Sequence, residues 1–168
     1  LNAFDFGDLI LFCVKLFEEH ADIREIYQKN FKYILVDEFQ DTNFIQNKWL
    51  NLLVNEKKNI CCVGDDDQSI YSWRGAEIKN FLTFDKIYSN CKVFKLEQNY
   101  RSTKNILETA STLISNNSNR VGKKLWSSAT QGEPVKLNCY KTGKEEAQGI
   151  SDIIEHKIKK KYSLNNVS

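Results

Sequence analysis

The sequence predicts an α/β fold built around a parallel sheet. Residues 33–36 and 59–63 are short apolar runs that acidic residues follow closely, a pattern typical of buried parallel strands. Around these runs, apolar side chains recur at helical spacing. Strands that alternate with helices in this way favour a parallel sheet joined by helical crossovers.

The expected elements follow one another along the chain. From the N-terminus these are two amphipathic helices, over residues 7–20 and from Asp22 onward, a strand over 33–36, a helix over 44–54, a strand over 59–63 and a helix over 76–88. They are followed by a strand over 93–96, a helix that Ser102 or Thr103 caps, a polar and basic connection over 116–132, a strand over 133–140 and a last helix over 145–161. After the first two helices the order is therefore strand, helix, strand, helix.

Composition and charge narrow the class of protein. Hydrophobic residues make up 41% and charged residues 27% of the chain, which is ordinary for a globular protein. No apolar run approaches the roughly 20 residues that span a bilayer, so we expect no membrane segment. The net charge is only +2, so any affinity for nucleic acid must come from a local surface.

Cysteine spacing and the first residue give two further expectations. The five cysteines form no C-x-x-C pair, so we expect neither a structural metal ion nor a disulfide framework. A reducing, intracellular compartment follows, with nucleus, organelle and bacterial cytoplasm equally open. Because the chain starts at Leu1, contains no Met and lacks a secretory signal, we interpret it as a piece of a longer protein.

The acidic end of the first strand is one candidate site. Asp37 and Glu38 follow the apolar run side by side, at the edge of the sheet where open α/β folds bind ligands. Neighbouring strand residues point apart, so one carboxylate can hold a hard cation while the other orients or deprotonates a water molecule. The Walker B pattern, which holds Mg²⁺ in nucleotide hydrolases, has this form. The alternative is an acidic strand-to-helix turn without a chemical role.

The segment after the second strand combines two kinds of side chain. Gln68 carries a neutral amide that can contact a terminal phosphate or an attacking water molecule. Tyr71, Trp73 and Arg74 offer flat surfaces on which bases can stack regardless of sequence. The two aromatic residues could instead belong to the core, but the polar Ser, Arg and Gly residues around them indicate an exposed loop.

Three strings resemble, in order, the motifs of one family. Val36-Asp-Glu-Phe-Gln-Asp-Thr-Asn43 resembles motif II of superfamily 1 helicases of the UvrD/PcrA/Rep family, Val63-Gly-Asp-Asp-Asp-Gln-Ser-Ile-Tyr-Ser-Trp-Arg-Gly-Ala76 resembles motif III, and Leu96-Glu-Gln-Asn-Tyr-Arg-Ser102 resembles motif IV. Upstream, Phe4-Asp-Phe-Gly-Asp-Leu-Ile10 is similar to the DFDDL segment that precedes motif II, with Gly7 in place of an acid. The resemblance covers nearly the whole chain, from residue 3 to residue 150.

The resemblance implies RecA-like domains. Residues 1–30 would be the end of the inserted helical domain 1B, residues 31–95 the later part of RecA-like domain 1A, and residues 96–168 the start of the second RecA-like domain, 2A. The expected α/β fold is then one RecA-like parallel sheet domain and the start of a second, with helices of the insertion at the N-terminus.

The resemblance also implies a function. The protein would be an ATP-dependent DNA helicase that moves 3′ to 5′ along single-stranded DNA and unwinds duplex DNA in repair or replication. Its cofactors would be ATP and Mg²⁺. Its partners would be single-stranded DNA, junctions of single- and double-stranded DNA, and repair or replication proteins.

Residue roles at the nucleotide follow by position in the motifs. Asp37 would coordinate Mg²⁺, Glu38 would be the general base for the hydrolytic water, and Gln68 would sense the γ-phosphate. In the family, the arginine that matches Arg101 contacts the γ-phosphate from the opposite domain, and the tyrosine that matches Tyr100 packs on the adenine. A surface ion pair at a helix start is the alternative for Arg101.

Residue roles at the DNA follow in the same way. Tyr71, Trp73 and Arg74 would couple the nucleotide site to single-stranded DNA. Phe6 matches an aromatic residue that lines the DNA path in family members. A core position at the start of an apolar helix is the equally weighted alternative for Phe6.

Half of the expected ATP site is missing from the 168 residues. No G-x-x-x-x-G-K-[ST] string occurs, and motifs V and VI are absent too. We therefore expect the isolated piece to be inactive and the activity to belong to the longer protein. Two alternatives stay open: a non-catalytic nucleic-acid-binding protein that keeps the helicase scaffold, and the helicase subunit of a recombination nuclease.

Overall fold

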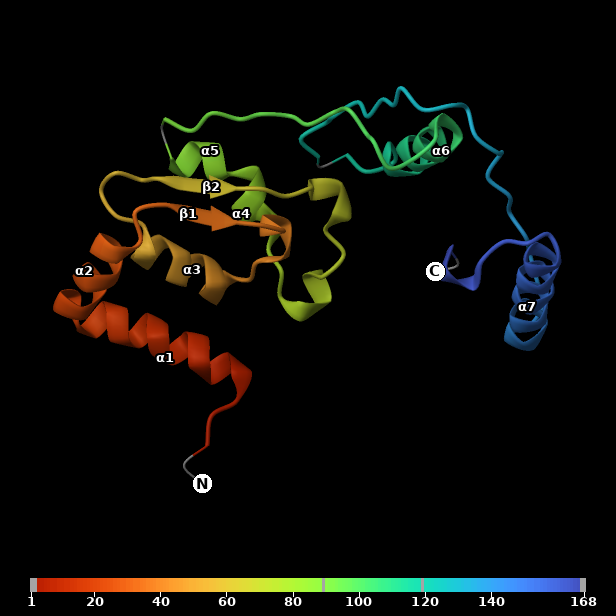
Figure 1. The fold of residues 1–168 in the computed structure, drawn as a ribbon. Helices are drawn as coiled ribbons and strands as arrows, with labels where there is room; N and C mark the ends of the chain where they lie inside the picture. The colour runs from red at the N-terminus through yellow and green to blue at the C-terminus, as the bar shows by residue number, and fades with distance from the viewer. Residues whose placement is uncertain (1–2, 89, 119, 167–168) are drawn as a thin grey trace.

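The structure is a computed structural model that describes residues 3–88, 90–118 and 120–166. The first part of the chain (residues 3–88) packs helices beside a small parallel sheet (Figure 1). The second part (residues 90–166) extends away from the sheet and carries its helices along that path (Figure 1). Within these described ranges, no helix has both the length and the apolarity to cross a membrane.

The N-terminal helices form where the sequence predicts them. α1 (Phe6–Glu19) begins with a capping box, in which the Asp5 carboxylate accepts the Asp8 N–H at 2.8 Å and the Asp8 carboxylate accepts the Asp5 N–H at 3.1 Å. α2 (Ala21–Asn30) follows directly. α1 packs on α3 (Phe44–Leu53) and buries Val14 and Phe17, each of which contributes about 1.5–3 kcal/mol by leaving water.

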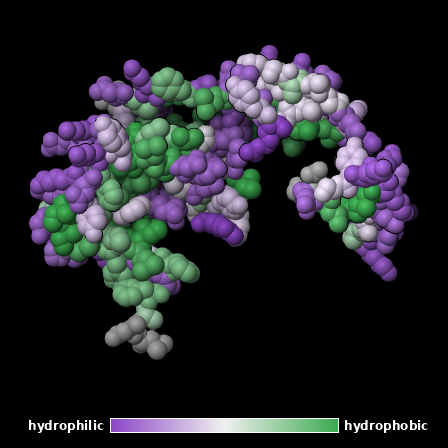
Figure 2. All heavy atoms as spheres, viewed as in Figure 1, coloured by the Kyte–Doolittle hydropathy of each residue, from purple (hydrophilic) through white to green (hydrophobic). Residues whose placement is uncertain are grey.

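The N-terminal end of α1 leaves apolar side chains in solvent. Phe6 is 91% exposed, and Leu9 and Phe12 are also exposed. Figure 2 shows hydrophobic side chains gathered at this end of the first part. The core position considered for Phe6 is therefore wrong for this structure.

The sheet confirms the parallel pairing. β1 (Ile34–Val36) and β2 (Ile60–Cys62) run parallel, with Ile34 opposite Ile60 and Val36 opposite Cys62. α3 forms the crossover between them. Burial on both faces, expected from the apolar runs, is wrong: Leu35 is 79% exposed, because no described residue covers the sheet face on which it lies.

The helix expected over residues 76–88 is two short helices. α4 (Ile78–Leu82) and α5 (Phe84–Ile87) meet at Thr83. The Thr83 hydroxyl donates to the Lys79 carbonyl at 2.8 Å, a local hydrogen bond that bends helices. The break lets Phe81 and Phe84 both reach Phe39, at ring-centroid distances of 6.4 and 5.5 Å. Phe39 is 1% exposed and lies at the centre of this small core.

The strands predicted over residues 93–96 and 133–140 are wrong. Both segments are irregular and carry exposed apolar side chains. A strand is stable only beside a partner that takes its backbone hydrogen bonds. Among the described residues, the first segment has only an isolated bridge just beyond its end, between Gln98 and Trp126.

The two helices of the second part are confirmed. α6 (Lys104–Ile114) has Thr103 at its N-cap, but its first N–H groups donate to the carbonyls of Thr130 and Gln131, at 3.2 and 3.0 Å. The connection over 116–132 is irregular in its described residues, as predicted, and its end thus serves as the cap of α6. α7 (Gly143–Lys159) has Thr142 at its N-cap, and the Thr142 hydroxyl accepts the Glu145 N–H.

Candidate functional site

The carboxyl end of β1 turns sharply at Glu38. Its backbone is left-handed, with φ of 49°, and a short 3₁₀ helix (Phe39–Asp41) follows. Such a conformation is uncommon outside glycine and concentrates at functional sites. Asp37 and Glu38 are both exposed, and Asp37 Oδ1 accepts the Glu38 N–H at 2.9 Å. The turn therefore presents two carboxylates to solvent at the edge of the sheet.

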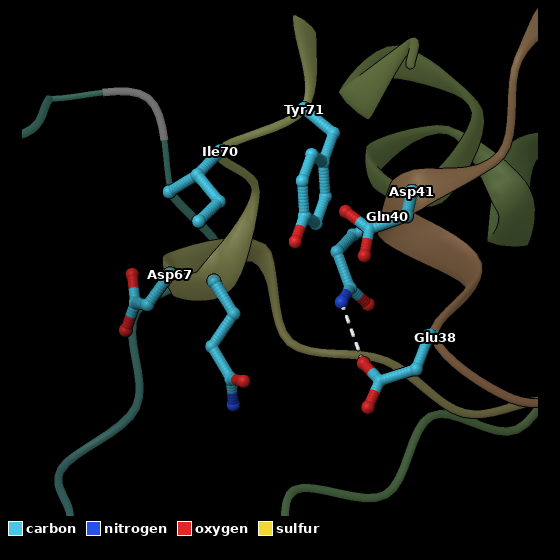
Figure 3. A pocket seen from close by; sticks show the side chains of 7 residues that line it. Glu38, Gln40, Asp41, Asp67, Ile70 and Tyr71 are labelled. Atoms are coloured by element: carbon cyan, nitrogen blue, oxygen red, sulfur yellow. Dashed lines mark hydrogen bonds between the residues drawn. The ribbon is translucent and has the colours of Figure 1, made fainter. Parts of the chain in front are cut away.

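Gln40 joins this turn to the loop after β2. Its side chain is 1% exposed, and its Nε2 donates to Glu38 Oε2 at 2.7 Å (Figure 3). Its Oε1 accepts the Asp65 N–H at 2.9 Å. Sequence reasoning did not single out Gln40, although the residue stands in the motif II string two places after Glu38. Its amide, which can donate and accept at once, is the signal that was available.

A glycine makes room for this bridge. A Cβ at Gly64 would lie 2.6 Å from Gln40 Oε1 and 2.8 Å from the Phe81 ring. Any larger residue there would push the amide of Gln40 away from the loop. The close approach of the two segments therefore depends on glycine at this position.

The loop over residues 64–75, called the Gln68 loop below, holds Gln68 beside the acidic turn. Gln68 is the last residue of a 3₁₀ helix (Asp66–Gln68), and the Gln68 Nε2 donates to Asp65 Oδ2 at 2.8 Å. Gln68 and Glu38 line one open cavity of about 550 Å³ (Figure 3). The remaining lining residues are Gln40, Asp41, Asp67, Ile70 and Tyr71.

Asp65 is held in its charged form. Burial acts to raise the pKa of its carboxyl, but hydrogen bonds from Lys123 and Gln68 outweigh burial and leave the pKa below its ordinary value. The Asp65 carboxylate is therefore a fixed acceptor for the Gln68 amide at neutral pH.

Tyr71, Trp73 and Arg74 lie together in solvent beyond Gln68. The Arg74 guanidinium lies 4.5 Å from the Trp73 ring centroid and 5.2 Å from that of Tyr71. Trp73 is 72% exposed and Tyr71 36%. The alternative that these aromatic residues belong to the core is therefore wrong, and the exposed loop is confirmed. Gly75, with φ of 87°, ends the 3₁₀ helix (Ser72–Arg74) that carries them. Tyr71 lines both the first cavity and a second of about 400 Å³ that Arg74 also lines.

Three predicted site residues lie elsewhere. The Tyr100 hydroxyl donates to Gln98 Oε1 at 2.8 Å, and the ring is exposed. Arg101 is exposed, with its backbone N–H bound to Asn99 Oδ1. Neither these residues nor Phe6, at the start of α1, line either of the two cavities. The structure thus brings together Glu38, Gln68 and Tyr71, but not Arg101.

The acidic turn fits a hard divalent cation better than the aspartate cluster does. Asp65, Asp66 and Asp67 place carboxylate oxygens within 4.8 Å of one another, but protein donors already bind each of them. In the acidic turn, Asp37 Oδ1 accepts the Glu38 N–H and Glu38 Oε2 accepts the Gln40 amide, while the other carboxylate oxygens of these two residues take no hydrogen bond from the described residues. Carboxylate oxygens at an exposed turn suit Mg²⁺, which keeps several of its waters.

Sequence comparison defines the class of protein to which this fold and site belong. Residues 1–89 match the model of the UvrD/REP helicase N-terminal domain, and residues 94–168 match that of the UvrD-like helicase C-terminal domain. The chain belongs to the UvrD/REP helicase family.

Among individual relatives, the chain is similar to a probable DNA helicase II homolog of Rickettsia conorii, with 48% identity over 168 residues, which cover 99% of this chain and 26% of that protein. It is also similar to the ATP-dependent DNA helicase PcrA of Staphylococcus epidermidis, with 47% identity over 164 residues, covering 96% of this chain and 22% of the relative. The chain therefore spans about a quarter of the length of the curated relatives it matches.

Proposed function

We propose that the complete protein is an ATP-dependent DNA helicase and that this chain supplies the hydrolytic half of its ATP site. The observation that carries the proposal is the acidic turn. Glu38, in a left-handed conformation, is held by the buried Gln40, which also binds the loop that presents Gln68. Family membership and the names of the relatives support the same function.

Each side chain of the turn has a proposed role. Asp37 would hold Mg²⁺, which on binding neutralises charge on the phosphates. Glu38 accepts the proton of the attacking water as general base, and Gln40 fixes the direction of its carboxylate. Gln68 contacts the γ-phosphate or the water through its amide.

The second part of the chain would complete the site from across a cleft. We assign residues 1–30 to the end of domain 1B, 31–95 to the later part of RecA-like domain 1A and 96–168 to the start of RecA-like domain 2A. The junction between the two matched family models, between residues 89 and 94, supports the second boundary. Arg101 then reaches the γ-phosphate when the domains close, and Tyr100 packs on the adenine. Both side chains are exposed and accessible for such a contact.

Single-stranded DNA would bind on the Gln68 loop. Tyr71, Trp73 and Arg74 stack on bases, and Phe6 contributes an exposed ring at the start of α1. Because Gln68 and Trp73 share one loop, nucleotide at Gln68 changes the position of the stacking surface. The complete protein would then step 3′ to 5′ along the strand, unwind junctions of single- and double-stranded DNA, and act with repair or replication proteins.

The proposal assigns activity to the complete protein. The 168 residues contain no P-loop string, and the P-loop lysine and hydroxyl form the other half of such a site. We therefore expect the isolated chain to hydrolyse no ATP. Robust ATP turnover by the purified 168-residue chain would contradict this division of the site.

A substitution in the complete protein tests the general base. Glu38→Gln keeps the size and the hydrogen-bonding geometry of the side chain but removes the base, so DNA-stimulated ATP hydrolysis falls by about 10² to 10⁴-fold while ATP binding is retained. Glu56→Gln, at an exposed glutamate of the turn before β2, is the matched control and keeps wild-type turnover. Wild-type hydrolysis in Glu38→Gln would remove Glu38 from this role.

A further inference from the structure

Two ion pairs connect the Gln68 loop to the second part of the chain. Arg120 donates to Asp67 twice, from Nε to Oδ1 at 2.9 Å and from a terminal nitrogen to Oδ2 at 2.5 Å. Lys123 forms an ion pair with Asp65. The partners are separated by more than 50 residues along the sequence, so these contacts join distant segments.

A backbone contact lies between the two ion pairs. The Val121 N–H donates to Asp66 Oδ2 at 2.6 Å. On its other side, the segment is held by Lys95, whose Nζ donates to the carbonyls of Val121 and Gly122 at 3.2 and 2.7 Å. The segment that begins at Arg120 is therefore fixed to the loop by three consecutive aspartates.

The two ion pairs are unusually sheltered for this molecule. Their side chains are between 15% and 21% exposed, whereas those of the Lys29–Glu25 pair on α2 are 77% and 60% exposed. Shelter from solvent and the two-pronged geometry of Arg120 both strengthen an ion pair. All three carboxylates are thus bound by the chain itself, and the cluster serves as an attachment point within the protein.

Gln68 lies at the end of this attachment. The 3₁₀ helix Asp66–Gln68 carries Asp67 and Gln68 as neighbours, and Asp65 binds Lys123 and the Gln68 amide at the same time. Asp65 also donates its N–H to Gln40, which holds Glu38. A continuous series of contacts therefore runs from the segment at Arg120 to the acidic turn.

We propose that Asp65, Asp67, Arg120 and Lys123 form a charged clamp between the two parts of the chain, and that the clamp positions Gln68. Movement of the second part is then transmitted directly to the Gln68 loop, which also carries Trp73. The expected consequence of the clamp, which is that it couples ATP hydrolysis to DNA binding, rests on the proposed function. Arg120 and Lys123 act as positioning residues, because neither lines the cavity that Glu38 and Gln68 share.

The test compares Asp67→Asn, Arg120→Gln and the double variant in the complete protein, with Lys86→Gln, at an exposed lysine of α5, as control. The readouts are the ratio of DNA-stimulated to basal ATP turnover, the KM for ATP, and amide hydrogen exchange at Gln68 and Val121. Each single variant is expected to lower the ratio by about fivefold or more and to raise the KM for ATP. The double variant is expected to lower the ratio no further than the single variants do, because the two substitutions remove the same contact, between Asp67 and Arg120. Exchange at both amides speeds up.

The outcomes separate the clamp from the proposed function. A ratio equal to that of Lys86→Gln, or effects of the two single variants that multiply in the double variant, would overturn the clamp. If Asp67→Asn fails to fold, Arg120→Gln and Lys123→Gln are each compared with Lys86→Gln instead, and ratios equal to that of the control in both variants would overturn the clamp. A wild-type protein without DNA-stimulated turnover would overturn the proposed function instead, and unchanged hydrogen exchange in Arg120→Gln would then overturn the clamp independently.

Discussion

The two parts of the chain differ in where their apolar side chains lie. The first part buries Val14, Phe17, Phe39, Leu50 and Leu53, whereas the second buries Leu107. The second part also leaves Phe94, Leu96 and Leu137 more than four-fifths exposed. Apolar runs are present in both parts, so apolar sequence alone does not build a core. A run is ordered as a strand where another strand lies beside it, as β2 lies beside β1.

The candidate site follows the same division. Glu38 and Gln68 belong to the first part of the chain and are linked through the buried Gln40 and through Asp65. Tyr100 and Arg101 belong to the second part and do not line the cavity that Glu38 and Gln68 share. Under the proposed function, Glu38 and Gln68 are held in place and Arg101 arrives from a second element, an arrangement that suits a reaction gated by domain closure.

The largest effect expected from this contrast is on stability. Phe39→Ala should destabilise the chain by about 3–5 kcal/mol, because it leaves a cavity among Phe81 and Phe84. Phe94→Ala, the same change at a side chain that is 81% exposed, should stay within about 0.5 kcal/mol of wild type. Chemical denaturation of the 168-residue chain measures both. Equal destabilisation by the two variants would remove the contrast between the parts.

A smaller loss of stability is expected from a substitution at Gln40, which joins the turn after β1 to the loop after β2. Gln40→Leu fills the same space but leaves the Asp65 N–H without its acceptor and Glu38 without its donor, at a stability cost of about 1–3 kcal/mol. In the complete protein the same change should also lower kcat for ATP. Gln148→Leu, at an exposed glutamine of α7, is the control and should alter neither quantity. Unchanged turnover in Gln40→Leu would mean that Glu38 needs no support from Gln40.

The fold of the first part could be predicted because its signals are local. Helical periodicity located α1, α2 and α3, and the apolar runs located both strands and their parallel direction. The break at Thr83 could not be predicted from periodicity, since it depends on one hydroxyl and on the position of Phe39. The strands expected over 93–96 and 133–140 failed because the pairing of a strand depends on residues distant in sequence.

Prediction of the site was limited in the same way. The strings around Glu38, Gln68 and Tyr71 were sufficient to identify three residues that line one cavity. Gln40 was overlooked because its importance lies in being buried between two segments. The contacts of Asp65 and Asp67 with Lys123 and Arg120 could not be foreseen, since each joins residues more than 50 positions apart.

The central claim is that the Gln68 loop ties ATP hydrolysis to single-stranded DNA, and Trp73→Ala in the complete protein tests it most directly. The measurement is ATP turnover with and without single-stranded DNA, together with DNA affinity. Tyr33→Ala is the control, because the two aromatic side chains are equally exposed, Tyr33 at 73% and Trp73 at 72%. Tyr33 lies just before β1, whereas Glu38 follows the other end of that strand. Trp73→Ala should weaken DNA binding by about 1–3 kcal/mol and reduce DNA stimulation while basal turnover stays close to wild type. DNA binding and stimulation as strong as those of Tyr33→Ala would contradict the claim.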